Sequence, residues 1–420
     1  MSIVNRNKYL TVLFLLLISI LLFSCGNDVN IAETERTENE SDEVYFNYSM
    51  SFCKGGFCYT DMYGMAYYTD PYTGNSSVIC ARPNCEHKRA SYLNPKAECD
   101  GWLGYMPQFL FMTDENEFYL VKHEYDGVHT KGMFDLSFVR ADLNGSNRKV
   151  LAELENTENA LAAAYGNGLF AFGYRLSSDM ESVGVGAMDS LDKFVSGIYL
   201  IDVKDGTKKK IREIEEYQAY CGNVHIIGDR LYYQINYTNE YVDYDRAFSE
   251  NLQERLDFEA ELTGKIVTEM YYYDISSGIE TCYLKTGRCE SYAAGDRQLI
   301  RIDGRLKYYK AGMEINLKNE IALEEYFDLN LHSFSGIYIR EDSILIFTDD
   351  RVLEYMFETG EISDFANGTL NGKEICMVNA EVGDIVYYSV KINDHGQIAF
   401  RSVNKEMFDK GDLSKAVKLY

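Results

Sequence analysis

Basic residues are scarce in this chain relative to acidic ones. The sequence has 41 Lys and Arg residues against 66 Asp and Glu residues, which gives a formal net charge of −25. A surface of this sign repels nucleic-acid phosphates and anionic lipid headgroups. We therefore expect no nucleic-acid partner, and we expect that charge does not hold the protein on a membrane.

The motifs of the common catalytic classes are missing as well. The chain has no G-x-S-x-G or H-E-x-x-H motif, no Walker-type phosphate loop and no calcium loop of the D-x-D-x-D-G kind. Five of the six histidines stand alone and fit ordinary polar positions: His123, His129, His225, His332 and His395. No catalytic residue is predicted, although a pair of glycosidase carboxylates is set by geometry and leaves no spacing signature.

Tryptophan and proline are almost absent, whereas other aromatic residues abound. There are one Trp and four Pro residues, but 35 Tyr and 22 Phe residues. Tyrosine and phenylalanine fit half-buried, pleated positions, so this surplus favours β-strands. All four prolines and the only tryptophan fall within residues 71–107.

The N-terminus has the order of a bacterial lipoprotein signal. Arg6 and Lys8 precede an apolar run that ends in Leu22-Phe23-Ser24-Cys25. The run is too short to span about 30 Å of hydrocarbon as a helix, and a small residue precedes the cysteine. It resembles a lipobox, which implies cleavage of a signal peptide (residues 1–24) and diacylation of Cys25. The protein would then be lipid-anchored in the cell membrane on its extracytoplasmic face; the alternative is an uncleaved anchor.

The next stretch, residues 25–43, predicts an extended acidic tether. Between Gly26 and Glu43 seven acidic residues face a single base, Arg36. Like charges and few apolar residues keep such a segment solvated. The folded body is therefore expected to begin near residue 44.

A short phrase recurs along residues 44–420. Residues 198–207 read IYLIDVKDGT, 270–278 read MYYYDISSG and 352–361 read VLEYMFETGE, with looser copies at 66–75 and 138–147. Each copy is a strand that runs into a tight turn in which glycine supplies the positive φ. Tandem four-stranded units predict an all-β fold, a β-propeller, rather than a pair of β-sandwiches.

We count about seven blades, with six or eight as alternatives, because units begin near residues 44, 104, 160, 221, 290, 333 and 374. The N-terminal strand, residues 44–48, is expected to close the ring by pairing with strands from the last residues. The pattern resembles TolB-like and related propellers of bacterial surface lipoproteins.

One insertion is expected to be helical. Within residues 239–268, Phe248, Leu252, Leu256 and Leu262 recur near helical spacing with acidic residues on the other side, and Ser249 can cap the helix. We expect a helix laid over the edge or rim of a blade.

The Cys- and Pro-rich segment 71–107 carries the candidate site. Cys80, Cys85, His87 and Cys99 follow one another with the spacing of metal ligands. They predict a closed, structural metal site, most naturally for zinc, or a disulfide among the three cysteines, or thiols. The order C-x-x-P-x-C-x-H resembles a segment in surface lipoprotein propellers of gut-type Gram-positive anaerobes, a family without an assigned activity.

Two functions follow as hypotheses. The first is a membrane-anchored binding or scaffold propeller, monomeric, whose central face recognises a glycan, a peptide or a protein partner through Tyr and Phe side chains. The second is a carboxylate-based hydrolase or lyase that acts on polysaccharide. Two acids with raised pKa values at the centre of the ring would favour the enzyme.

Overall fold

The computed structural model describes residues 44–47, 50–53, 55–61, 63–89, 97–104, 107–122, 136–154, 159–177, 193–243, 246–247, 249–294, 296–302, 305–317, 336–348, 351–368, 370, 375–392 and 398–419. The expected signal peptide, Cys25 and the acidic tether therefore lie outside the described residues. In the described part, no helix is long and apolar enough to cross a membrane.

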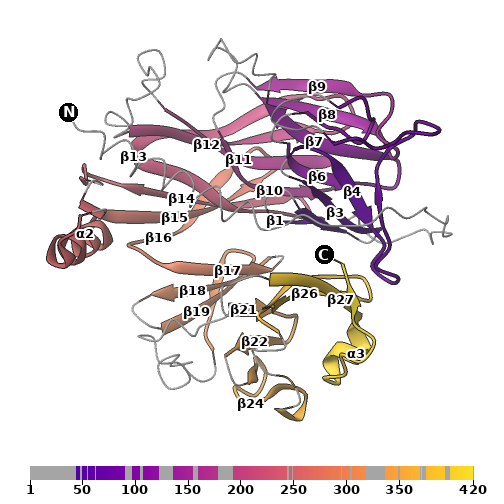
Figure 1. Ribbon diagram of the computed structural model, residues 1–420. Helices are drawn as coiled ribbons and strands as arrows, with labels where there is room; N and C mark the ends of the chain where they lie inside the picture. Colours follow the sequence, from indigo (N-terminus) through magenta and orange to yellow (C-terminus); the bar gives the residue numbers. More distant parts are fainter. Residues whose placement is uncertain are drawn as a thin grey trace.

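The fold is a β-propeller, as the sequence predicts (Figure 1). The described strands form seven four-stranded antiparallel blades: four of them are separate sheets, and three are joined in one continuous 12-stranded sheet. Blade 1 contains β2 (Met50–Cys53), β3 (Gly56–Thr60), β4 (Ala66–Thr69) and β5 (Ser76–Val78). Blade 2 contains β6 (Gln108–Met112), β7 (Asn116–Lys122), β8 (Leu136–Asp142) and β9 (Lys149–Leu154). Blade 3 contains β10 (Asn159–Gly166), β11 (Leu169–Ser177), β12 (Lys193–Asp202) and the first half of β13 (Lys208–Ile227).

Blade 4 contains the second half of β13, β14 (Arg230–Thr238), β15 (Ile266–Asp274) and β16 (Glu280–Thr286). Blade 5 contains β17 (Glu290–Ala294), β18 (Arg297–Ile302), β19 (Arg305–Lys310) and β20 (Met313–Ile315). Blade 6 contains β21 (Gly336–Ile339), β22 (Ser343–Phe347), β23 (Val352–Met356) and β24 (Ile362–Asp364), followed by the 3-10 helix η4 (Phe365–Gly368). Blade 7 contains β25 (Met377–Val382), β26 (Ile385–Lys391), β27 (Ile398–Asn404) and β28 (Val417–Lys418), with α3 (Lys405–Asp409) before the last strand.

The repeated phrase is the third strand of a blade and the turn that leads to the fourth. In blade 4, Asp274 accepts hydrogen bonds from the backbone N–H and the hydroxyl of Ser277, at 2.8 and 2.6 Å. Gly278 then adopts a φ of +72° and donates its N–H to the carbonyl of Asp274 at 2.8 Å. A side chain with a Cβ is strained at this φ, which is why glycine recurs at this position. Corresponding glycines with positive φ are Gly74, Gly145, Gly206 and Gly360.

Strand β13 belongs to two blades. Its residues 208–217 pair with β12, and its residues 217–227 pair with β14. The positive φ values of Gln218 and Asn223, 53° and 49°, mark the bend at which the chain leaves the outer edge of blade 3 and begins the inner strand of blade 4. The boundary between these blades is thus a bend rather than a loop.

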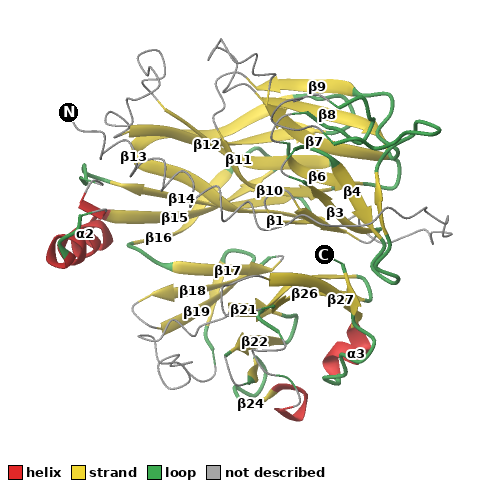
Figure 2. Ribbon diagram, in the orientation of Figure 1, coloured by secondary structure: helices red, strands yellow, loops and turns green. Residues whose placement is uncertain are grey.

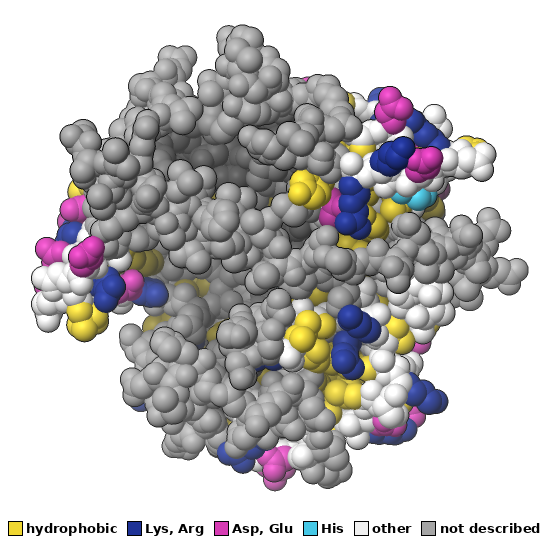
Figure 3. Space-filling model, in the orientation of Figure 1, with side chains coloured by type: hydrophobic (Ala, Val, Ile, Leu, Met, Phe, Trp, Pro, Cys, Tyr) yellow, Lys and Arg dark blue, Asp and Glu magenta, His cyan; other side chains and the backbone are white. Residues whose placement is uncertain are grey.

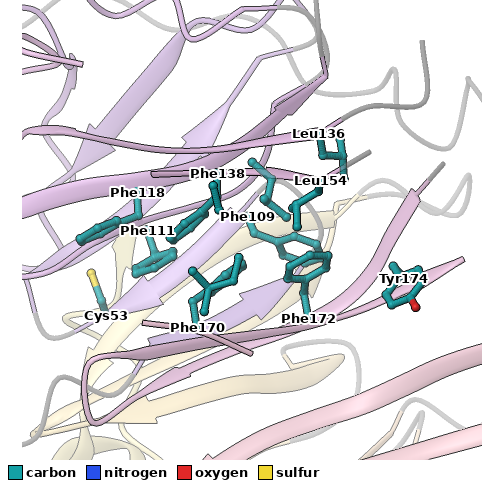
Figure 4. Close-up of a cluster of buried hydrophobic side chains, with 13 residues drawn as sticks. Cys53, Phe109, Phe111, Phe118, Leu136, Phe138, Leu154, Phe170, Phe172 and Tyr174 are labelled. Carbon is teal, nitrogen blue, oxygen red and sulfur yellow. The ribbon is translucent and has the colours of Figure 1, made fainter. Parts of the chain in front are cut away.

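Stacked aromatic rings explain the surplus of Phe and Tyr. Between blades 1, 2 and 3, Phe138 lies 4.9 Å from Phe170, and Phe111 lies 5.2 Å from Phe118 and 5.4 Å from Phe170, measured between ring centroids (Figure 4). Offset stacking at these distances adds to the free energy gained by burying the rings. Other buried clusters link every further pair of adjacent blades around the ring.

The ring closes differently from the sequence expectation. Strand β1 (Val44–Asn47) pairs with β2 and, through Val44, with Tyr165 of β10, whereas the last blade consists of C-terminal strands alone. Blades 7 and 1 meet instead through side chains: the ring of Phe52 lies 5.2 Å from that of Tyr387, whose hydroxyl donates to the carbonyl of Cys53 at 3.0 Å. The expected pairing of residues 44–48 with the last residues is therefore wrong. Aromatic packing supplies the closure.

The helical insertion is present and runs as α2 (Leu252–Lys265), at the left edge of Figure 2. Asn251 caps it rather than Ser249, because its side chain accepts the N–H of Gln253 at 2.9 Å. The expected apolar face is not buried: Leu252 and Leu256 are 61% and 53% exposed, and Phe258 is the buried residue of the helix. Figure 3 shows the acidic, basic and apolar side chains that this helix presents to solvent.

Candidate metal centre

The Cys- and Pro-rich segment, residues 71–107, is not a loop throughout: it contains the outer strand of blade 1, β5, and its cysteines follow that strand. Cys80 lies two residues beyond the end of β5, and a turn over Pro83 and Asn84 brings Cys85 back, with the N–H of Cys85 donating to the carbonyl of Arg82 at 3.3 Å. Asn84 and His87 both have positive φ, 58° and 47°. These tight reversals allow ligands that are close in sequence to face the same point.

The structure brings together all four residues that the sequence singled out. One donor atom from each of Cys80, Cys85, His87 and Cys99 lies within 4.8 Å of every other. The Sγ atom of Cys99 lies 3.5 Å from Nδ1 of His87. In tetrahedral zinc coordination, bonds of about 2.3 Å to sulfur and 2.0–2.1 Å to nitrogen separate the two donors by about 3.6 Å. This edge of the cluster has the dimension of a zinc tetrahedron.

The three cysteines are thiols in the structure, without a disulfide among them. Burial raises the pKa of the Cys99 thiol to about 12. Burial acts in the same sense on Cys80, but hydrogen bonds from the backbone of Arg82 and Asp100 and from the thiols of Cys99 and Cys85 hold the pKa of Cys80 below its ordinary value. Donors directed at a sulfur stabilise a thiolate, which is the form that binds metal.

A set of arginine contacts holds the returning part of the segment. Arg82 pairs with Asp100 at 2.8 Å. Arg148, from the turn between β8 and β9, donates to the carbonyl of Trp102 at 2.5 Å and also to that of Asp100. The indole N–H of Trp102 donates to the carbonyl of Tyr63 at 3.0 Å. Blades 1 and 2 thus fix the chain directly after Cys99.

The other side of the cluster is fixed by Arg89. Its guanidinium donates to the hydroxyl of Tyr67 at 2.8 Å and lies 3.4 Å from the carboxylate of Asp61. Asp61 is buried and accepts the backbone N–H groups of Tyr63 and Met65, both at 2.9 Å. His87 therefore sits two residues before an anchored position. The contacts of Arg89 and Arg148 had no spacing signal in the sequence, because they join residues from separate strands and turns.

Outside this cluster, the site predictions meet the structure unevenly. Cys25, His123, His129, His332 and His395 lie outside the described residues. His225 is described, and burial lowers its pKa to about 4, so it is neutral at physiological pH.

The enzyme hypothesis expects two acids with raised pKa values, and one such acid is found among the described residues. Among them, Glu117 of β7 is the carboxyl group whose pKa is raised, to about 8, because it is fully buried. Both of its carboxyl oxygens lack a hydrogen-bond partner. Glu117 interacts electrostatically with Tyr119, which lies in the cluster packed between blades 1 and 2, and with Arg148, whose positive charge opposes the rise in pKa.

Comparison with known proteins finds structural neighbours of low sequence identity. No protein-family model and no curated protein matches the sequence. Among solved structures, an oligogalacturonate lyase from Vibrio parahaemolyticus is similar with 9% identity and a TM-score of 0.45, covering 88% of this chain and 92% of the lyase. The acylaminoacyl peptidase of Pyrococcus horikoshii has 13% identity and a TM-score of 0.41, covering 71% of this chain; the match spans 44% of the peptidase.

A third similar structure is the β-propeller domain of the Trilobed protease from Pyrococcus furiosus, with 11% identity and a TM-score of 0.40, covering 71% of this chain and 80% of that domain. All three matches have TM-scores below 0.5 and sequence identities of 9–13%. At such identities they assign no activity to this chain.

Proposed function

We propose that this protein is a lipid-anchored propeller on the outer face of the cell membrane, and that it binds a glycan, peptide or protein partner at one end of its blades. The proposal rests on where the long connections between strands lie on the propeller. The two longest, 79–107 and 239–265, both leave from the end where the first strands of the blades begin. We call this the loop end. Binding residues concentrate on long connections held by a rigid scaffold.

The opposite end, where the first strands finish, carries mostly tight turns and is called the turn end. Residues 54–55, 167–168 and 228–229 connect first to second strands there. The axis of the ring offers little room for a ligand, because β1 lies against the first strands of four blades, β2, β6, β10 and β25. Recognition through the loop end therefore replaces the expected recognition at the centre of the ring.

The binding proposal is tested on exposed side chains of matched size at the two ends. Leu256 of α2 is at the loop end and 53% exposed; Ile279 is at the turn end and 62% exposed. Arrays of cell-wall glycans, polysaccharide fragments and peptides identify the ligand. Leu256→Ala and Tyr241→Ala are then expected to weaken binding about fivefold or more, as at interface hot spots, whereas Ile279→Ala leaves it unchanged.

Two results would contradict the proposal. One is a loss of binding in Ile279→Ala that equals the loss in the loop-end variants. The other is the release of new reducing or unsaturated ends from a polysaccharide by the purified protein, which would indicate catalysis rather than binding.

The anchor is tested separately. Radiolabelled palmitate is expected to label the wild-type protein in cells and to be absent from Cys25→Ala, because the thiol is the acceptor of the diacyl group. Equal labelling of both proteins excludes the lipid anchor.

For the cluster at Cys80, Cys85, His87 and Cys99 we propose a structural zinc ion. Three thiolates and one imidazole are a donor set that zinc favours, and four protein ligands leave no open position for a substrate. The ion would cross-link the longest connection at the loop end, which strand pairing alone does not hold. Metal analysis of protein purified under reducing conditions is expected to give one zinc per chain.

A further inference from the structure

The N-terminal strand shows from which end the chain enters the propeller. Strand β1 runs antiparallel to β2, with Val44 opposite Cys53 and Asn47 opposite Met50. Cys53 is the last residue of β2, next to the turn into β3. Val44 also pairs with Tyr165, one residue before the end of β10. Two independent pairings therefore place Val44 at the turn end.

The chain then passes along the axis to the loop end. Asn47 and Met50 lie at the beginning of β2, which is the end where residues 79–107 and 239–265 leave the blades. Strand β1 touches the first strands of four blades on its way. The whole thickness of the propeller thus separates residue 44 from the loop end.

We infer that the anchored protein stands with its turn end toward the membrane and its loop end toward the medium. The inference rests on the proposed lipid at Cys25. Only 19 residues, from Cys25 to Glu43, connect the proposed lipid to Val44. A seven-residue strand such as β7 is about 23 Å long. The tether reaches a membrane at the turn end directly, whereas the loop end would require it to pass around the rim.

This orientation names the surface that partners meet. Helix α2 and the cluster-bearing segment face outward, so the ligand is a molecule that approaches from the medium or from the cell wall, and membrane lipid is excluded as the ligand. The turns 54–55, 167–168 and 228–229 face the bilayer across the acidic tether. With a net charge of −25, the protein is repelled by anionic headgroups, so the tether also keeps it at a distance.

Energy transfer to the bilayer tests the orientation. The full-length lipidated protein is reconstituted in liposomes that carry an acceptor dye on the headgroups. A donor dye is attached either at Glu115, in the turn between β6 and β7, or at Leu256 on α2, and both positions are exposed. The attachment uses an encoded azide amino acid, because the chain has other cysteines that a thiol-reactive dye would label. Since the two ends differ by about 20 Å, transfer from position 115 is expected to be about twofold higher.

Three outcomes distinguish a failure of the proposed orientation from a failure of the proposed lipid anchor. Equal transfer from the two positions, or higher transfer from position 256, overturns the orientation. Insertion of a second copy of residues 26–43 after Glu43 is expected to reduce the difference in energy transfer between positions 115 and 256. If this difference does not change, something other than the tether sets it, and the inference is overturned. In C25A, transfer from both positions is expected to vanish; if it persists, the lipid anchor itself is wrong, and the orientation falls with it.

Discussion

Removal of zinc from the cluster is expected to destabilise the loop end by about 3 kcal/mol. The ion would close a loop of 20 residues from Cys80 to Cys99. A cross-link that closes such a loop lowers the entropy of the unfolded chain, which stabilises the folded state by about 3 kcal/mol at 25 °C. The ion pair between Arg82 and Asp100 spans nearly the same loop, but the Arg82 side chain is 53% exposed, so solvent screens the pair and its contribution to stability is small. It cannot replace the metal.

Two measurements check this expectation. Guanidinium denaturation with and without a zinc chelator gives the change in the free energy of unfolding, and hydrogen exchange of residues 97–104 reports on the segment itself. His87→Ala is expected to lose the metal and to match the chelated protein, because three thiolates without the imidazole leave one coordination position to water. Faster exchange should appear at residues 97–104 and be absent from blade 6.

Cys282→Ser is the matched control, since Cys282 is an exposed cysteine of β16 outside the cluster. It is expected to keep the metal and the stability of the wild type. The reasoning is refuted if chelation changes neither stability nor exchange, if His87→Ala keeps its zinc, or if Cys282→Ser loses as much metal as Cys99→Ser. A disulfide detected between any two of Cys80, Cys85 and Cys99 in protein isolated from cells would replace the metal as the cross-link.

Two further predictions concern the blades. Phe52→Ala, at the closure between blades 1 and 7, is expected to lower the free energy of unfolding by about 3–5 kcal/mol, because the ring is 1% exposed and packs on three other rings. Denaturant titration of this variant and of the control Ile279→Ala measures the loss. A loss in Phe52→Ala smaller than that in the control would show that the closure lies elsewhere. The pKa of Glu117 is raised from 4.5 to about 8 in the folded protein. Between these pH values the folded state keeps a proton on Glu117 that the unfolded state has lost. The free energy of unfolding therefore falls by about 1.4 kcal/mol per pH unit as pH rises from 4.5 toward 8. Glu117→Gln is expected to flatten this part of the pH–stability curve, and a wild-type curve that does not fall between pH 5 and 8 would refute the assignment.

The parts of the fold that could be predicted from the sequence are those held by hydrogen bonds between residues close together in the chain. The phrase that ends in Asp274, Ser277 and Gly278 predicts a strand and its turn, because the hydrogen bonds that make the turn lie within five residues. Repetition of that unit predicts the propeller. The blade starts at residues 290, 336 and 377 fall within three residues of the expected 290, 333 and 374.

The candidate site was readable for a similar reason. Thiol and imidazole donors are rare enough that their spacing alone marks Cys80, Cys85 and His87 as a group. The sequence also named Cys99, 12 residues after His87, and the structure places its Sγ atom 3.5 Å from Nδ1 of His87. The structure also added Arg89 and Arg148, whose partners lie on other strands and turns.

Other features depended on the tertiary structure alone. The stripe of Leu252 and Leu256 predicts a buried helix face, yet both side chains are exposed, because spacing along a helix does not reveal which face meets a neighbour. Strand β1 likewise satisfies the same backbone hydrogen bonds with β2 as it would with the last blade, so its sequence cannot choose the partner. The sequence determined the strands, the turns and the four residues of the Cys/His cluster, since these depend on neighbours in the chain. Packing between distant segments decided the closure of the ring and the path of β1.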